Sequence, residues 1–479
     1  MKKILVCILV LSSALIGCST DLDINRDPDL LDPNKAPLSA QLPSGITGII
    51  GSEGAPYAII GGMWSQYWTQ SNAANQYKDI DNYSISTSDY NFAWNGMFDA
   101  LGDIRNVKRR ALEEENWKYF LIATTLEVQA AQVLTDFYGD IPYKEANNNT
   151  ILEPKFNTSE EVYEFMIEDL NLALSKNLDS SKGTNPGSDD FIYGGNMTNW
   201  VKFANTLKLK IFMRQATSTK SSVASAGIND LLSKNTAFLD TDAGMTQFTD
   251  AVNQSNPLYE YNIRKLNVAT NLRMSTTLAS FFDANADTRK AKYYGTGNSL
   301  NQGDYTSTAG AGTIAVVTIK ATTPAYLMTK EESLFLQAEA LERYASGTGA
   351  KEKYDAAINA NFARYSLDGT SFVSGAYAYP TSGTLEQKIE AIITQKWVSS
   401  FPGNGFEAFF EKNRTGYPKT SSVAQSSSSY VPGEFVYAKN GTTGGLFPKR
   451  IAYPLSERNA NPNAPTLVPI TTPIWWHKL

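Results

Sequence analysis

The sequence predicts an all-α fold, in which a core of paired helices is interrupted by long irregular loops and contains little β-structure. Apolar residues recur at helical spacing along most of the chain, as Phe120, Ala123 and Leu126 do. Residues 117–137 carry only three charges, so we expect a central, largely buried helix there. Between residues 237 and 325, only 313–320 have the composition of a strand.

Further helices are expected in pairs joined by short turns. In the pair 330–345 and 350–365, the small residues Ala338 and Ala357 and the aromatic Tyr354 occupy positions typical of tetratricopeptide repeats. The core is therefore predicted to be tetratricopeptide-like, although its repeats are irregular. The remaining helices are expected at 38–51, 57–70, 91–113, 159–176, 199–216, 220–234 and 274–284.

The N-terminus has the features of a secretory signal. Lys2 and Lys3 precede an apolar run that is too short to cross a bilayer. The sequence LIGC at 15–18 resembles a bacterial lipobox, so residues 1–17 are expected to be removed and Cys18 to be acylated. The acidic, proline-rich residues 18–37 would then be a flexible, lipidated tether. An ordinary signal peptide with an incidental cysteine is the alternative.

Composition excludes several classes of function. The second cysteine, Cys7, lies in the signal, so the mature chain has no disulfide and no thiolate metal site. His477 is the only histidine, which removes His-dependent triads and sites with two His ligands. A net charge of -6 argues against nucleic acid. We expect no cofactor; a calcium ion is possible but nothing in the sequence specifies one.

The distribution of loops divides the mature chain into regions. Residues 38–479 are expected to form a single domain whose helical-repeat core comprises 38–236 and 326–414. The intervening residues 237–325 and the C-terminal residues 415–479 are rich in Gly, Ser, Thr, Asn and Pro. Because long ordered loops in a folded body usually carry function, these two insertions are predicted to lie on the ligand face.

A set of segments, in a fixed order along the chain, carries a family resemblance. The segments are LIGC (15–18), DFYGDIPYKEA (136–146), NWVKFANTLKLKIFMR (199–214), DTRKAKYY (287–294), FLQAEALER (335–343), IITQKWVSSFPGNGFEAFFEKNRTGYP (392–418), RIAYPLSERNANPNA (450–464) and PIWW (473–476). Together they resemble the SusD/RagB outer-membrane nutrient-binding lipoproteins, and more narrowly the SusD-like branch of starch-utilisation type. Thr288 stands where that family usually has proline, and Lys412-Asn413-Arg414 where two arginines are commoner; both differences concern packing.

The resemblance implies a function and partners. Such a protein is anchored by lipid to the outer membrane, faces the cell exterior, captures an oligosaccharide and delivers it to a SusC-like TonB-dependent porter. The resemblance implies neither catalysis nor a cofactor. Three alternatives remain: a peptide-binding lipoprotein of the same family, a repeat scaffold that binds only protein partners, and a glycosidase using carboxylates such as Glu331 and Glu332 or Asp189 and Asp190.

Two loops have the residues that a sugar site needs. A pyranose ring is held by an exposed aromatic plane under its C–H face and by polar groups around its hydroxyl rim. In the first loop the expected platforms are Trp68, Tyr77 and Tyr83, with Gln70, Asn72, Asn75 and Asp79 at the rim. In the second loop the expected residues are Tyr259, Tyr261, Arg264, Asn271 and Arg273. The alternative for Trp68 is that it closes its helix against the core.

One conserved-looking segment of the resemblance is expected to be structural. In GNGFEAFFEKNRTGYP, Phe406, Phe409 and Phe410 are predicted to be core residues, because they recur at helical spacing. Glu407 and Arg414 are predicted to form a structural ion pair with each other and not a ligand site. Specificity should therefore lie outside this segment.

Overall fold

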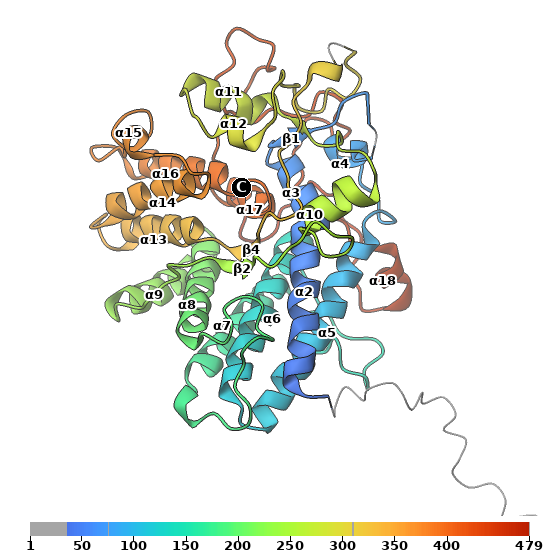
Figure 1. Ribbon diagram of the computed structural model, residues 1–479, viewed down its shortest axis with the longest axis vertical. Helices are drawn as coiled ribbons and strands as arrows, with labels where there is room; N and C mark the ends of the chain where they lie inside the picture. The colour runs from blue at the N-terminus through green and yellow to red at the C-terminus, as the bar shows by residue number, and fades with distance from the viewer. Residues whose placement is uncertain (1–35, 75, 309–310, 479) are drawn as a thin grey trace, which may run out of the picture. The chain divides into compact units, whose positions relative to one another are not determined.

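Helices dominate the structure, a computed structural model that describes residues 36–74, 76–308 and 311–478 (Figure 1). The fold class is the predicted one, an all-α core with long loops and very short strands. The predicted signal peptide, Cys18 and all but the last two residues of the predicted tether lie outside the described residues. None of the helices described is both long enough and apolar enough to cross a membrane.

The helices and strands follow one another along the chain with loops of very different length. The longer helices are α2 (Leu38–Ser52), α3 (Ala58–Trp64), α5 (Asn91–Glu113), α6 (Trp117–Tyr138), α7 (Ser159–Leu174), α8 (Met197–Arg214), α9 (Ser221–Ser233), α11 (Thr276–Ala284), α13 (Lys330–Tyr344), α14 (Ala350–Arg364), α16 (Leu385–Ser399) and α17 (Gly405–Thr415). The shorter helical segments are η1 (Glu53–Tyr57), α4 (Lys78–Asp81), η2 (Leu178–Ser180), α10 (Pro257–Tyr259), η3 (Glu260–Lys265), α12 (Lys290–Tyr293), η4 (Ala311–Thr313), α15 (Thr370–Val373) and α18 (Leu455–Ala460). The strands are β1 (Trp68–Thr69), β2 (Ala243–Met245), β3 (Arg273–Met274) and β4 (Ala325–Met328).

Helix α6 is the centre of the core, as predicted. Every residue from Tyr119 to Tyr138 is buried, and the helix packs against α2, α5, α7 and α8. The side chain of Asn116 caps its first turn by accepting a hydrogen bond from the Tyr119 amide. Gly139 ends the helix with a φ of 91°, a conformation that favours glycine.

The predicted helix pairs are present and stack on one another. Figure 1 shows α8, α9, α13, α14 and α16 arranged in succession on one side of the fold. At the contact between α13 and α14, Ala338 and Ala357 are fully buried and Tyr354 lies between the helices at 2% exposure. Small residues let the two helices approach, and the tyrosine fills the remaining space, as the tetratricopeptide-like pattern requires.

Two predicted elements differ from the structure. The helix expected at 57–70 ends at Trp64, because Gln66 adopts a left-handed φ of 57° and the chain continues as strand β1. The strand expected at 313–320 is not a regular strand: its residues Ile314, Val316 and Val317 make isolated bridges to separate partners. Residue composition predicted an extended backbone there, and residues 315–317 do lie antiparallel to β3, where the Met274 amide donates to the Ala315 carbonyl and the Val317 amide to the Leu272 carbonyl; the pairing is too short to form a regular strand.

Strand pairing brings two distant loops together. Strands β1 and β3 are antiparallel, with Trp68 opposite Met274 and Thr69 opposite Arg273. The side-chain Nε2 of Gln70 also donates to the backbone carbonyl of Asn271. The loop that follows β1 and the segment that precedes β3, which are the two stretches predicted to bind ligand, are therefore neighbours.

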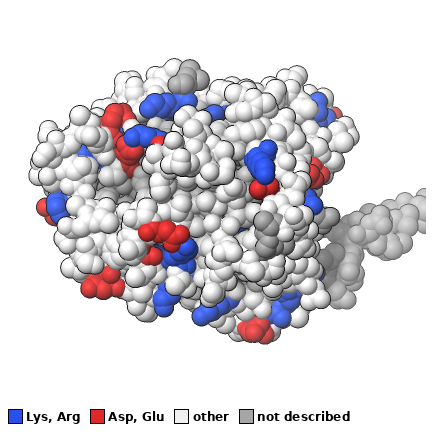
Figure 2. Space-filling model, turned by 90° about the horizontal axis from the view of Figure 1, so that it is seen from above, with Lys and Arg blue, Asp and Glu red and all other residues white. Residues whose placement is uncertain are grey.

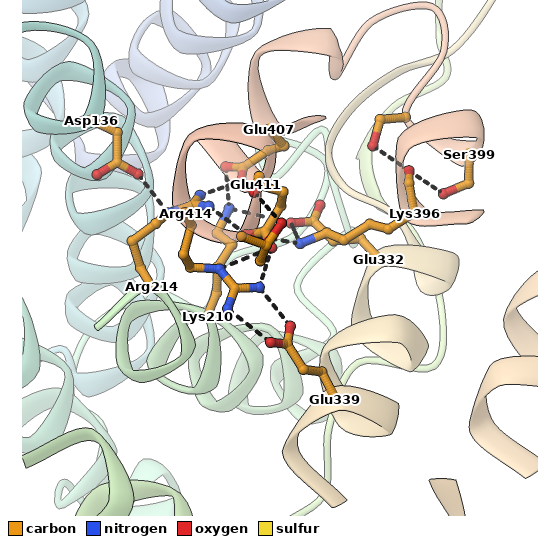
Figure 3. A network of polar contacts seen from close by, with 12 residues as sticks. Asp136, Lys210, Arg214, Glu332, Glu339, Lys396, Ser399, Glu407, Glu411 and Arg414 are labelled. Atoms are coloured by element: carbon orange, nitrogen blue, oxygen red, sulfur yellow. Dashed lines mark hydrogen bonds and ion pairs between the residues drawn. The ribbon is translucent and has the colours of Figure 1, made fainter. Parts of the chain in front are cut away.

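A buried ion network joins five helices (Figure 3). The guanidinium of Arg214 on α8 lies 3.1 Å from Asp136 of α6 and 2.6 Å from Glu407 of α17. Arg414 pairs with Glu339 of α13 at 2.6 Å. The predicted pairing of Glu407 with Arg414 is therefore wrong: both residues are structural, but each bonds to a different helix, because they lie seven positions apart on α17 among different neighbours. The residues labelled in the network are Asp136, Lys210, Arg214, Glu332, Glu339, Lys396, Ser399, Glu407, Glu411 and Arg414.

Candidate ligand-binding site

Trp68 is a core residue. Its side chain has no exposed surface, and its indole nitrogen donates to the carbonyl of Ile59 at 3.3 Å. The ring lies against Gly62, where an added Cβ would come within 2.0 Å of it, and edge-on to Phe401. The prediction of an exposed platform is therefore wrong for Trp68, and the alternative, that it closes its helix against the core, describes its position.

Tyr77 and Tyr83 are also too buried to serve as exposed platforms, at 1% and 4% exposure. Tyr83 packs edge-on to Tyr437 of the C-terminal loop, with ring centroids 5.5 Å apart. Burial raises the pKa of Tyr77, and the neighbouring Tyr261 and Tyr90 raise it further, so its hydroxyl stays protonated. The prediction failed for Tyr83 because Tyr437 and Phe447, from the far end of the chain, pack against its ring.

The predicted rim residues of the first loop divide into two groups. Gln70 is fully buried, where its side-chain oxygen accepts from the Tyr77 amide at 3.1 Å, so it holds the loop and does not face solvent. Asn72 and Asp79 are exposed and remain available to a ligand. Asn75 lies outside the described residues.

The second predicted stretch is more accessible at its start than at its end. Tyr259 and Tyr261 are half-buried, and the guanidinium of Arg264 lies over the Tyr259 ring at 5.3 Å while pairing with Glu260 at 3.1 Å. Asn271 and Arg273, in contrast, are 2% and 5% exposed. These two support the backbone around β3, so the prediction that they line an exposed rim is wrong.

Three aromatic rings form an accessible strip that sequence reasoning identified only in part. Tyr90, at the start of α5, lies 5.6 Å from Phe92, which in turn stacks on Tyr261 at 5.8 Å with an interplanar angle of 22°. Phe92 is 45% exposed, a high value for a phenylalanine. We call Tyr90, Phe92 and Tyr261 the aromatic strip.

The missed members of the strip had a recognisable signal. Phe92 is the second residue of α5, so it lies in the first turn of the helix, and its side chain is exposed. The left-handed φ of 56° at Tyr90 turns the chain immediately before this helix. The cluster Tyr90-Asn91-Phe92 directly after a polar loop was the sequence feature that could have identified both rings.

A groove of about 610 Å³ opens beside the strip, between α2, α5 and the segment 253–265. Phe92 and Tyr261 line it, and its floor includes Gly51 of α2, where an added Cβ would meet nothing within 4 Å. We call this the aromatic groove. It is lined by Ser44, Gly48, Gly51, Ser52, Ala55, Pro56, Phe92, Gly96, Asp99, Ala100, Asp103, Asn253, Ser255, Pro257, Glu260, Tyr261 and Lys265.

Unpaired polar atoms lie next to the strip. In the part of the chain that the structure describes, the buried Tyr77 hydroxyl, Asn91 Oδ1 and Asn262 Oδ1 have no hydrogen-bond partner. Burial, followed by the nearby Tyr261, raises the pKa of Tyr90, so its phenol remains a hydrogen-bond donor at neutral pH. The unpaired polar atoms are buried and their residues do not line the groove, so the strip presents its aromatic planes to a ligand; such planes suit a ring that has C–H groups on one face.

The loop face is poor in charge. Residues 294–328 contain only Asp304 and Lys320, and residues 420–448 contain only Glu434 and Lys439. Figure 2, seen from the loop end of the fold, shows charged side chains scattered in small groups over a mostly uncharged surface. Such a face favours a neutral ligand over a polyanion or a highly charged peptide.

The carboxylates considered for catalysis have structural partners. Glu331 accepts from Arg364 at 2.8 Å, and Glu332 is 3% exposed and faces the ion network. Asp190 accepts from the Trp200 indole at 2.7 Å, and Asp189 accepts from the Tyr119 hydroxyl at 2.7 Å. None of the four lines the aromatic groove. Over the described ranges, no group of three or more His, Cys, Asp or Glu side chains could hold a metal ion.

Comparisons with known proteins show which family model and which solved structures this chain resembles. A family model described as SusD-like, starch-binding and associating with the outer membrane matches residues 42–438. A SusD homologue from Bacteroides uniformis is 21% identical with a TM-score of 0.73, and covers 92% of this chain and 99% of its own. A chitin-binding SusD homologue from Flavobacterium johnsoniae is 21% identical with a TM-score of 0.74, over 91% and 98% of the two chains. A search of curated protein sequences found no match.

Proposed function

Because this chain belongs to the SusD-like family of starch-binding proteins that associate with the outer membrane, we propose that it binds a neutral oligosaccharide in the aromatic groove. The proposal includes delivery of that ligand to a SusC-like TonB-dependent porter, and anchoring by lipid at Cys18 on the outer surface of the outer membrane. The observation that carries it is the exposed stack of Phe92 on Tyr261 at the edge of the groove.

The size and composition of the groove support this ligand. A volume of about 610 Å³ falls in the range of small-ligand sites, which is about 300–1,000 Å³. The exposed carboxylate of Asp99 lines the wall and can accept hydrogen bonds from sugar hydroxyls. Asp99, Asp103, Glu260 and Lys265 line the groove, so its described wall has three carboxylates and one ammonium group; this set can bond to neutral hydroxyls and disfavours a polyanion.

The position of the groove also favours a glycan-binding protein over a repeat scaffold that binds only proteins. The groove lies along α2 and α5, whereas α9, α13 and α14 stack on the opposite side of the ribbon (Figure 1). The stacked helices therefore remain available for the porter while the groove takes a glycan. The homologue from Flavobacterium johnsoniae, which is described as chitin-binding, supports glycan as the ligand class.

Isothermal titration calorimetry against a panel of neutral oligosaccharides, including malto- and chito-oligosaccharides, tests the proposal. Phe92→Ala and Tyr261→Ala should each weaken binding about 2- to 12-fold, since one stacking contact contributes about 0.5–1.5 kcal/mol. Gly51→Phe should block the groove floor and weaken binding further, with no loss of stability, because glycine is a poor helix former and the space is open.

Leu446→Ala is the matched control, since this exposed side chain lies outside the groove. Its affinity should equal that of the wild type. Failure of every glycan in the panel, or binding that is indifferent to all three groove variants, would contradict the proposed site. Binding of peptides in place of glycans would support the peptide-binding alternative.

A further inference from the structure

A second, smaller cavity lies where the C-terminal turn of α17 meets the segment 447–449. It has a volume of about 70 Å³ and is more enclosed than the aromatic groove. Most of its wall is aromatic, but Lys412, Asn413 and Lys449 also face it. Trp64, Tyr83, Phe409, Thr420, Phe435, Phe447 and Pro448 complete the lining.

The two lysines have no carboxylate to neutralise them. Lys412 donates to the carbonyl of Gly416 at 2.8 Å, to the carbonyl of Pro418 and to the hydroxyl of Thr420. Lys449 donates only to Asn413 Oδ1, at 2.8 Å. Throughout the described chain, no Asp or Glu lies within ion-pair distance of either ammonium group, and Glu434 acts on Lys412 only at longer range. Both lysines are half-buried, and charges partly removed from water are normally paired.

The side-chain amide of Asn413 shows where a partner is needed. Its oxygen must face Lys449, because an ammonium group can only donate hydrogen bonds. The amide therefore cannot be turned round, and its Nδ2 is left buried without an acceptor in a residue that is 4% exposed. Lys449 has two further N–H groups and the buried amide of Asn413 has two, so the residues that line the cavity offer donors to a bound acceptor.

The electrostatics around the cavity agree with this excess of hydrogen-bond donors. Burial, with the repulsion of Lys449 next, lowers the pKa of Lys412 to about 7. Burial also holds the pKa of the nearby His477 well below its usual value, and Lys449, Arg214 and Arg450 lower it further. Burial is the main reason that each group is disfavoured as a cation, and the nearby positive groups add to it, which is consistent with a site that lacks negative charge.

We propose that this cavity binds one small inorganic anion, chloride or an anion of similar size, held by Lys449 Nζ and Asn413 Nδ2 with Lys412 as a nearby countercharge. A volume of about 70 Å³ is far below the roughly 300–1,000 Å³ of small-molecule sites, which excludes a nucleotide or an oligosaccharide and leaves room for a single small ion. The anion would connect α17 to the C-terminal loop that covers Tyr83, and so stabilise the packing beneath the loop face.

Bromide is the probe, because its anomalous scattering locates it in a crystal. Crystals of the wild-type protein in sodium bromide should show one anomalous peak within hydrogen-bond distance of Lys449 Nζ and Asn413 Nδ2. In solution, replacing gluconate by bromide at constant ionic strength should raise the melting temperature by about 1–3 °C, with saturation. Constant ionic strength removes general screening from the comparison.

Variants separate this site from other effects of salt. Lys449→Met keeps the length of the side chain but should abolish the bromide-dependent rise, whereas Lys449→Arg should retain it. Lys292→Met, which removes an exposed lysine on α12, is the matched control and should respond like the wild type. A cavity that contains only water in the bromide crystal, or an equal rise in Lys449→Met, would overturn the proposal. The crystal measurement needs no variant and so holds even if Lys449→Met does not fold.

Discussion

Replacing Trp68 by alanine should damage stability and leave ligand affinity unchanged. The indole is fully buried, packs against Gly62 and Phe401, and donates a hydrogen bond to Ile59. Truncation of a buried tryptophan removes its transfer free energy and leaves a cavity, and such changes cost about 3–5 kcal/mol. Because Gly62 has no side chain to move into the space, the site cannot collapse easily, which favours the upper part of that range.

Urea unfolding of the wild type and of Trp68→Ala measures this cost, and calorimetry with the bound oligosaccharide measures the affinity. Leu152→Ala, at a side chain that is 89% exposed, is the control and should change the unfolding free energy by about 0.5 kcal/mol or less. The reasoning is refuted if Trp68→Ala weakens ligand binding while the unfolding free energy remains that of the wild type. That result would mean that the indole faces the ligand.

Three other perturbations test separate parts of the account. Burial raises the pKa of Glu407, but Lys210, Arg214 and Lys396 outweigh burial and lower it to about 2. A carboxylate with a lowered pKa stabilises the fold above its usual pKa of 4.5, and this contribution is lost as pH falls toward about 2. Glu407→Gln should therefore lower the free energy of unfolding by about 3–5 kcal/mol at pH 7 and by clearly less at pH 3, as measured by urea unfolding. An equal loss at both pH values would contradict an ionised Glu407 in the network. Cys18→Ala should move the protein from the membrane fraction to the detergent-free supernatant, and retention in the membrane would refute the lipid anchor. A pull-down in mild detergent should recover a TonB-dependent porter with the tagged protein, whereas recovery of the isolated chain alone would count against that partner.

Much of the helical core was predictable from the sequence because its signal is local. Large apolar residues of α6 recur every three or four positions among few charges, and Gly139 marks its end, so neither feature depends on distant parts of the chain. The contact of α13 with α14 was likewise predictable from small residues around Tyr354. The ion pairs were not predictable from the sequence. Glu407 bonds to Lys210 and Arg214, and sequence spacing does not show which helix α17 packs against.

The candidate site was predicted only at the level of segments. Both stretches were recognised from their aromatic and polar content, and strands β1 and β3 bring them together. The individual roles of Trp68 and Tyr83 were wrong, because their burial depends on Phe401 and Tyr437, which lie more than three hundred residues further along the chain. A sequence pattern shows that a loop is aromatic but does not show which rings other segments will cover.

A crystal structure of the protein with its bound oligosaccharide tests the central claim most directly. We predict that a sugar ring lies on Phe92 and Tyr261, with its hydroxyls toward the walls of the aromatic groove. The account is contradicted if the oligosaccharide occupies another face of the protein and leaves Phe92 and Tyr261 without contact.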